Sequence, residues 1–302
     1  MNILLIGGCG YIGSALFSRF RDKHEVRSCD LNLFGCNNSL NWVCNYNKLE
    51  KHQIEGFDVI ILTAAHSSVP MCNEDHAGAL QNNVYNFINF VQKLDEKQKF
   101  IYAGSSCVYL KSDISGSVET DPLYPNDMLS FSKTTIDQYM QAFNPCEYYG
   151  LRFGSVNGWS ENFRTDLMIN SMTKDAIKSR ELTISNGNNY RPILGMKDLV
   201  NAVERIVLST EDKRGIYNLA SFNTNIREVG HAVADILECN INELPGAGSY
   251  DFCINSSKFE KVYDFEFCEN LDSIVTSIKD NQDIILGKEF PARKVANIYG
   301  KI

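Results

Sequence analysis

The sequence has no long apolar run, no dense cluster of basic residues and no internal repeat. Its first apolar stretch, residues 3–6, ends at a glycine and is too short for a secretory signal or a membrane span. Lys and Arg total 29 against 37 Asp and Glu, a formal net charge of −8, so the electrostatic signature of a nucleic-acid-binding protein is missing. We therefore expect a cytoplasmic protein that binds neither nucleic acid nor a membrane.

Cysteine is plentiful, but its spacing lacks the common metal motifs. The ten cysteines include neither a CxxC pair nor the Cys/His pattern of a zinc site. Their scatter favours free thiols in a reducing compartment, and no metal is predicted.

Short apolar segments alternate with longer segments of helical periodicity, which is typical of βαβ units and a parallel sheet. The predicted strands are residues 3–6, 25–29, 59–62, 100–103 and 148–153. The predicted helices are residues 12–21, 78–94 and 130–143. After residue 155 the pattern loosens, with predicted loops at 158–165 and 185–191.

These patterns predict an α/β protein built on a Rossmann-type doubly wound parallel sheet. The sheet domain is expected to span residues 1–155, with a return near 193–220. A smaller mixed α/β lobe, which we expect to bind substrate, would comprise residues 156–192 and 221–302.

A glycine-rich turn follows the first predicted strand and opens the first predicted helix. Gly7, Gly10 and Gly13 fit GxxGxxG, and Gly8 with the last two fits GxGxxG. Such glycines allow a tight turn and a close approach of pyrophosphate, and the helix N-terminus offers free N–H groups. The cofactor-contact candidates in this turn are Gly7, Gly10, Tyr11, Ile12 and Gly13.

Asp30 ends the second predicted strand, twenty residues after Gly10. A carboxylate at this place can accept hydrogen bonds from the adenosine ribose and repels a 2′-phosphate, so the predicted cofactor is NAD. The alternative is an aspartate that only caps a turn.

With these residues in place, the chain resembles the extended short-chain dehydrogenase/reductase family of NAD-dependent nucleotide-sugar epimerases and dehydratases. The resemblance covers almost the whole chain. Residues 58–65 (DVIILTAA) resemble the family's fourth strand, which implies that Ala64 and Ala65 line the cofactor. Asn45 stands where the family usually has an aspartate that contacts adenine. Residues 151–158 resemble the strand and turn beneath the nicotinamide and sugar, and Ser155 is the substrate-binding candidate there.

The resemblance implies hydride transfer between a sugar carbon and NAD, with a Tyr as base, a Lys four residues later and a Ser or Thr on the oxyanion. Ser105 takes the Ser/Thr position, and Lys133 takes the lysine position, where it would also hold the nicotinamide ribose. The tyrosine is missing, because Leu129 stands four residues before Lys133 and cannot exchange a proton. The nearest earlier tyrosine is Tyr124.

Residues 104–109 (GSSCVY) are similar to the segment of GDP-fucose synthase and GDP-mannose 3,5-epimerase in which a cysteine is an acid/base. The resemblance makes Cys107 a candidate proton carrier, with Asp166 nearest to the place of its partner acid. A small buried apolar cysteine is the alternative. Arg191, followed by Pro192, resembles the segment that binds a nucleotide phosphate or ribose.

The resemblance therefore implies an NAD-dependent epimerase that acts on a nucleotide-activated sugar through a transient keto intermediate, in a homodimer. An NAD(P)H-dependent keto-sugar reductase is one alternative. A catalytically silent NAD- or nucleotide-sugar-binding protein is another, because Leu129 replaces the family tyrosine. Three explanations of Leu129 stay open: an engineered change, the use of a different acid/base, or the loss of catalysis.

Overall fold

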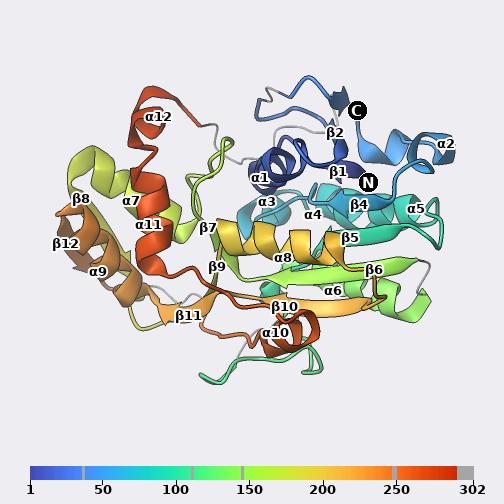
Figure 1. The fold of residues 1–302 in the computed structure, drawn as a ribbon. Coiled ribbons are helices and arrows are strands. Elements are labelled where there is room, and N and C mark those ends of the chain that lie inside the picture. The colour runs from blue at the N-terminus through green and yellow to red at the C-terminus, as the bar shows by residue number, and fades with distance from the viewer. Residues whose placement is uncertain (36–37, 110–111, 144–145, 247–249, 291–302) are drawn as a thin grey trace.

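The computed structural model describes residues 1–35, 38–109, 112–143, 146–246 and 250–290. Seven strands of this described chain form one parallel sheet in the order β3-β2-β1-β4-β5-β6-β10 (Figure 1). They are β1 (Asn2–Ile6), β2 (Glu25–Asp30), β3 (Asn41–Val43), β4 (Val59–Leu62), β5 (Lys99–Ala103), β6 (Glu147–Phe153) and β10 (Gly215–Leu219). The predicted Rossmann-type sheet is confirmed.

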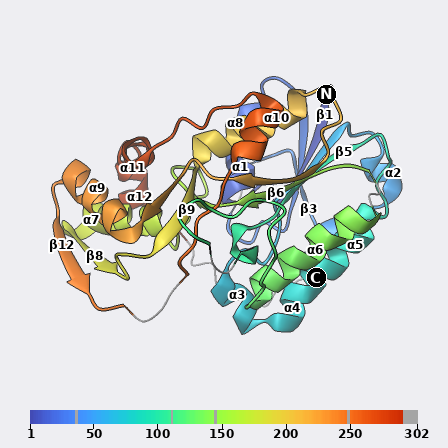
Figure 2. The same ribbon diagram turned by 90° about the horizontal axis from the view of Figure 1, so that it is seen from below.

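Helices cover both faces of this sheet (Figure 2). One face carries α1 (Tyr11–Phe20), α8 (Met196–Leu208) and α10 (Ser257–Tyr263). The other carries α3 (Val69–Glu74), α4 (His76–Leu80), α5 (Asn86–Val91) and α6 (Met128–Phe143). Successive side chains of β1 point to opposite faces of the sheet and therefore pack into two hydrophobic cores. Ile3 and Leu5 belong to the core on the α1 side, and Leu4 and Ile6 belong to the core on the α5 side.

Two details of the large sheet domain differ from the predicted elements. The predicted helix 78–94 is interrupted by a π-helical turn, Gln81–Tyr85, between α4 and α5. A π-helical turn holds one residue more than an α-helical turn, and the spacing of apolar residues in the sequence does not reveal this difference. The short edge strand β3 was not predicted, since its three residues are too few for an alternating pattern.

A smaller lobe stands beside the carboxyl ends of the strands, at the left of Figure 1. Its strands are β7 (Ser155–Asn157), β8 (Glu181–Ser185), β9 (Tyr190–Gly195), β11 (Phe222–Asn225) and β12 (Asn240–Leu244). Its helices are α7 (Met168–Ser179), α9 (Ile226–Leu237), α11 (Leu271–Lys279) and α12 (Gln282–Gly287). The short helix α2 (Lys51–Ile54) belongs to the large domain instead.

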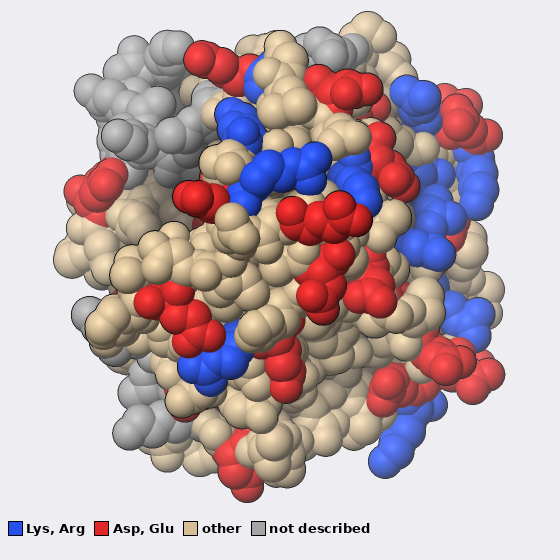
Figure 3. Space-filling view, turned by 90° about the vertical axis from the view of Figure 1, so that its left-hand side faces the viewer, with Lys and Arg blue, Asp and Glu red and all other residues tan. Residues whose placement is uncertain are grey.

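On the end of the molecule shown in Figure 3, acidic and basic side chains are interspersed.

A buried ion pair ties helix α6 to strand β6. Arg152 Nε lies 2.8 Å from Asp137 Oδ2, and the two side chains are 2% and 0% exposed. The Tyr102 hydroxyl donates to the other Asp137 oxygen at 3.0 Å. Asp137, which belongs to the sequence motif around Lys133, therefore anchors the helix in the core.

The expectation of free thiols is wrong for Cys9, which is disulfide-bonded. A disulfide requires two thiols that the fold brings together, and sequence spacing does not reveal such pairs. The cysteines described as free are Cys29, Cys44, Cys72, Cys107, Cys146, Cys239, Cys253 and Cys268. Among the described helices, none is long and apolar enough to cross a bilayer.

Candidate functional site

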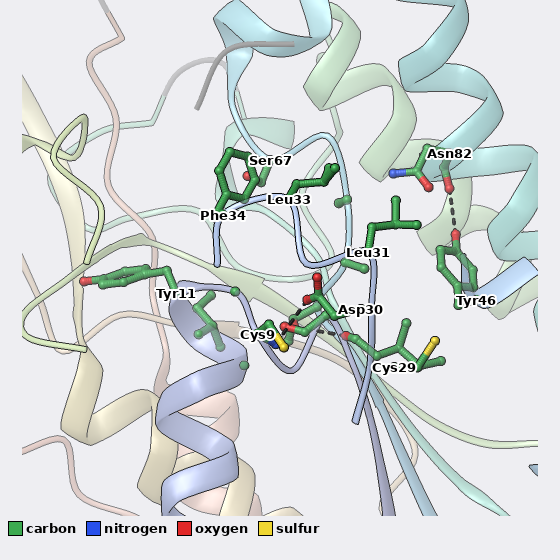
Figure 4. Close-up of a pocket in the computed structure, with 18 of the residues that line it drawn as sticks. Cys9, Tyr11, Cys29, Asp30, Leu31, Leu33, Phe34, Tyr46, Ser67 and Asn82 are labelled. Atoms are coloured by element: carbon green, nitrogen blue, oxygen red, sulfur yellow. Dashed lines mark hydrogen bonds between the residues drawn. The ribbon is translucent and has the colours of Figure 1, made fainter. Parts of the chain in front are cut away.

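A cleft opens at the carboxyl ends of β1, β2 and β4 (Figure 4). The connections reverse direction between β1 and β4, and in doubly wound sheets this is the place where ligands bind. The cleft walls include the candidates Gly7, Gly10, Tyr11, Ile12, Gly13, Asp30, Asn45, Ala64 and Ala65. The structure thus places nine of the ten cofactor candidates around one cleft; Lys133 lies in the neighbouring cavity described below.

The glycines of the turn pack backbone against backbone. Gly7 has a φ of +85°, and a Cβ there would lie 2.6 Å from the Ala64 nitrogen. A Cβ on Gly13 would lie 2.0 Å from the Gly7 oxygen. Helix α1 can therefore approach the turn only because Gly13 lacks a side chain, and the turn can approach the end of β4 only because Gly7 lacks one.

The N-terminus of α1 faces this cleft with its amide groups available. Gly10 is the N-cap, no side chain caps it in the described chain, and the first turn holds no acidic residue. Unsatisfied N–H groups and the positive end of the helix dipole bind phosphate groups. Together with the glycine cradle, this arrangement fits the pyrophosphate of a dinucleotide.

Asp30 and Asn45 line the same cleft as the glycine turn. The Asp30 carboxylate accepts hydrogen bonds from the Cys9 amide at 3.1 Å and the Asn32 amide at 2.8 Å. These contacts hold the carboxylate at the end of β2 beside the glycine turn, where such a group binds the ribose hydroxyls of NAD. Asn45 is buried and caps the short helix that begins at Tyr46, where its Oδ1 accepts from the Asn47 amide at 3.2 Å.

Replacing Asp30 by Ala is expected to weaken NAD binding about tenfold or more, because hydrogen bonds to a charged group contribute about 1.5–3 kcal/mol. Titration calorimetry with NAD measures the change. Asp22→Ala, which removes the same charge from an exposed position, is the matched control. Equal affinities in the two variants would contradict the assignment of Asp30.

A second cavity continues from the first toward the smaller lobe. The two share Tyr11, Ile12, Thr63, Ala65, Ser67 and Arg164 in their walls. The second cavity also brings together the predicted residues Ser105, Cys107, Leu129, Lys133, Ser155 and Arg191. The Tyr11 ring lies at the junction, and its hydroxyl donates to the Gly158 carbonyl at 2.7 Å.

Lys133 and Ser105 face this cavity from helix α6 and from the end of β5. Lys133 is 5% exposed, and its Nζ donates to the Ala103 carbonyl at 2.6 Å. Burial lowers the pKa of this ammonium group. Ser105 precedes a 3₁₀ turn, Ser106–Val108, and its hydroxyl donates to the Cys107 sulfur at 2.9 Å.

Leu129 lies one helical turn before Lys133 on the same face of α6. Its side chain lines the cavity and packs with Cys72 and Ala79. The position where the family resemblance implies a tyrosine therefore faces the cavity but presents only hydrocarbon.

Cys107 lines the cavity beside Ser105. Burial raises its pKa to about 12, and the Asp127 carboxylate adds to this effect, while the Ser105 hydroxyl and the Lys133 ammonium oppose it. A raised pKa favours the protonated thiol, the form that donates a proton.

Arg164 lines the second cavity, where Asp166 was expected, although the sequence analysis did not select it. Asp166 is absent from the described cavity wall; it forms an ion pair with Arg164, at 2.6 Å, with a side chain 41% exposed. The Arg164 side chain is 12% exposed and also donates to the Ser67 hydroxyl at 3.3 Å.

Tyr250 is another residue of the cavity wall that the sequence analysis did not select. Its ring lies beside the Arg191 guanidinium, 6.0 Å from the ring centroid, and its hydroxyl donates to Asp127. No motif in the sequence joins Tyr250 to helix α6, so only the folded chain reveals it.

The fold has close counterparts among solved structures. A UDP-glucose 4-epimerase from Thermus thermophilus, in complex with NAD, is 19% identical over 96% of this chain and 100% of its own, with a TM-score of 0.79. A UDP-glucuronic acid 4-epimerase from Bacillus cereus, in complex with UDP-glucuronic acid and NAD, is 17% identical over 94% of this chain and 100% of its own, with a TM-score of 0.82. An NAD-dependent NDP-hexosamine 5,6-dehydratase of tunicamycin biosynthesis is 16% identical over 93% of this chain and 98% of its own, with a TM-score of 0.83.

At identities this low the similarity establishes the fold. Residues 3–220 also match the sequence model of the NAD dependent epimerase/dehydratase family, which covers more than half of the chain. The glycine cradle, the open helix N-terminus and Asp30 fit the cofactor that this family uses. The chain therefore belongs to the NAD dependent epimerase/dehydratase family, and its cofactor is NAD.

Proposed function

We propose that this protein is an NAD-dependent epimerase that acts on a nucleotide-activated sugar through a transient keto intermediate. The observation that carries the proposal is the continuity of the two cavities, since the wall of the cofactor cleft runs directly into the cavity that holds Ser105, Lys133 and Arg191. The solved structures of similar fold include 4-epimerases of UDP-sugars, which supports this substrate class.

Each polar group has a distinct task in this proposal. NAD, when bound, supplies the hydride acceptor and later the hydride donor. Lys133 holds the nicotinamide ribose with the N–H groups that Ala103 does not take. Ser105 turns its hydroxyl from Cys107 to the sugar oxygen and stabilises charge there. Arg191 binds the diphosphate, since a guanidinium group pairs with phosphate through two hydrogen bonds. Arg164, whose Nε and Nη2 donate to Asp166, adds positive charge beside it.

We further propose that residues 156–192 and 221–302, apart from helix α10 on the large sheet, form the substrate-binding lobe on the sheet domain of residues 1–155 and 193–220. Residues 247–249 and 291–302 of this range lie outside the described chain. Arg164, Leu167, Tyr250 and Phe252 of that lobe contribute to the second cavity. Hydrogen exchange offers a direct test: a bound UDP-sugar should slow amide exchange near these residues, and protection confined to the sheet domain would contradict the division.

A homodimer belongs to the same proposal, by analogy with the family resemblance. Tyr85, Phe131 and Phe143 are 59%, 49% and 68% exposed on neighbouring helices of one face of the sheet. Pairing of this face between two copies would cover these rings. Sedimentation at micromolar concentration should give the mass of a dimer, and a monomer would contradict this part.

Leu129 favours a second candidate, a protein that binds NAD and a nucleotide sugar without turnover. The site would then keep its cradle, Lys133 and the arginines while it lacks a proton carrier on α6.

One experiment separates these functions. The NAD-loaded protein is incubated with UDP-glucose, UDP-glucuronic acid and UDP-N-acetylglucosamine, and the sugars are analysed by NMR and mass spectrometry. An epimerase gives an isomer of unchanged mass and leaves NAD oxidised, whereas a reductase consumes reduced cofactor in equal amount. A silent binder gives a raised melting temperature without product, and that result would contradict the proposed function.

A further inference from the structure

Tyr250 places a phenol in the substrate cavity from the smaller lobe. Its chain segment is fixed to β9 and to the residue before it: the Asn189 side chain donates to the Tyr250 carbonyl at 3.3 Å, and the Tyr190 amide donates to the Asp251 carboxylate at 2.7 Å. The ring also packs edge-on against Phe252, with centroids 6.3 Å apart. The phenol is therefore held in position by backbone and ring contacts together.

Asp127 accepts a hydrogen bond from this phenol and caps the start of helix α6. One carboxylate oxygen accepts the Tyr250 hydroxyl, and the other accepts the Ser130 amide at 2.9 Å. The Ser130 hydroxyl accepts from the Asp127 amide at 3.2 Å in return, which completes a reciprocal cap. Leu129 and Lys133 follow on the helix that this cap starts.

Leu129, Cys107 and Lys133 are less suited to carry the proton than Tyr250. Leu129 has no exchangeable proton. Burial raises the pKa of both Cys107 and Tyr250, but only the Tyr250 hydroxyl donates to a carboxylate, Asp127, that can take up its proton. In the described chain no carboxylate is hydrogen-bonded to the Cys107 thiol, whose partner is the Ser105 hydroxyl. Lys133 is engaged with the Ala103 carbonyl and the proposed ribose contact. A phenol with an adjacent carboxylate is the arrangement among these described residues that can both accept and return a proton.

We propose that Tyr250 and Asp127 together carry the proton that the family tyrosine would carry, in place of Leu129. This inference rests on the proposed function, which supplies NAD as the hydride acceptor. As the sugar carbon loses its hydride, its O–H bond breaks, the proton forms a new O–H bond on Tyr250, and the phenolic proton of Tyr250 moves to Asp127. In the return step Asp127 gives the proton back to Tyr250, which donates to the sugar oxygen as the hydride returns. Tyr250 is the catalytic residue, and Asp127 acts through it.

The decisive variant is Tyr250→Phe, because it keeps the ring that contacts Arg191 and Phe252. Its kcat is expected to fall about a hundredfold or more, the usual contribution of general acid–base catalysis. The Kd for a UDP-sugar should stay within about threefold, since a single neutral hydrogen bond contributes little net binding. Tyr124→Phe, at an exposed tyrosine outside the cavity wall, is the matched control.

Asp127→Asn separates the relay from the cap. Asparagine is as good an N-cap as aspartate, so the unfolding temperature should stay unchanged while kcat falls. A variant with Tyr250→Phe and Leu129→Tyr together should regain activity over Tyr250→Phe alone, because it returns a phenol to the cavity from α6. A merely structural role of Tyr250 would not give this recovery.

The outcomes distinguish this inference from the proposed function. If the wild type turns over and the kcat of Tyr250→Phe stays within about threefold of the wild-type value, the inference is overturned and the proposed function stands. Turnover by Leu129→Tyr but not by the wild type also overturns it, because Tyr250 then fails as a proton carrier. Silence in both proteins with all three sugars overturns the proposed function, and the inference falls with it.

Discussion

A Gly13→Ala variant is expected to bind NAD about a hundredfold more weakly than the wild type. The added Cβ would lie 2.0 Å from the Gly7 oxygen and 2.7 Å from the Gly8 Cα, both of which are backbone atoms that cannot move aside separately. Overpacking of this kind costs about 1–3 kcal/mol, and the upper value equals about a hundredfold in affinity. Relief would require α1 to move away from the turn, which takes its N–H groups away from the pyrophosphate.

Titration calorimetry with NAD measures this loss, and circular dichroism checks that the variant remains folded. Gly56→Ala is the matched control, since no atom lies within 4 Å of the Cβ that it adds. Wild-type affinity in Gly13→Ala would mean that the helix and the turn are not packed as described.

Asp137→Asn is expected to lower the free energy of unfolding by about 3–5 kcal/mol, the usual cost of removing one partner from a buried ion pair. The cost arises because the Arg152 guanidinium, 2% exposed, keeps its charge without a counter-ion. Asparagine has nearly the size of aspartate, so the loss reports on charge and hydrogen bonding more than on a cavity.

Urea denaturation followed by fluorescence measures the effect. Glu243→Gln makes the same chemical change in the exposed pair of Arg227 and Glu243, and it should leave the unfolding midpoint nearly unchanged. Equal shifts in the two variants would show that burial adds nothing to the Asp137–Arg152 pair.

The first half of the fold was predictable because its signals are local. Strands such as 59–62 are unbroken apolar runs, and a glycine turn followed by an aspartate at the end of the next strand is a short-range pattern. Asp30 and the glycines consequently stand around one cleft, as the sequence analysis expected of a dinucleotide site.

The second cavity was predictable only in part. Ser105 was found because it follows strand β5, and Leu129 and Lys133 were found because they lie on helix α6 in the order that the family resemblance implies. Arg164 was missed because a carboxylate was sought as a proton carrier, and Asp166 instead pairs with that arginine. Tyr250 was missed because it reaches the cavity from a distant segment, and contacts between distant segments produce no recognisable spacing pattern in the sequence.

The wall shared by the two cavities has a thermodynamic consequence. NAD and a nucleotide sugar that both contact Tyr11, Ile12 and Arg164 are energetically coupled, so each alters the binding affinity of the other by the same factor. If the nucleotide sugar lies over the inner end of the cofactor, dissociation of NAD must wait for the sugar to leave. Cofactor exchange would then be slowest when substrate is abundant, and the protein would retain one NAD molecule through many encounters with sugar.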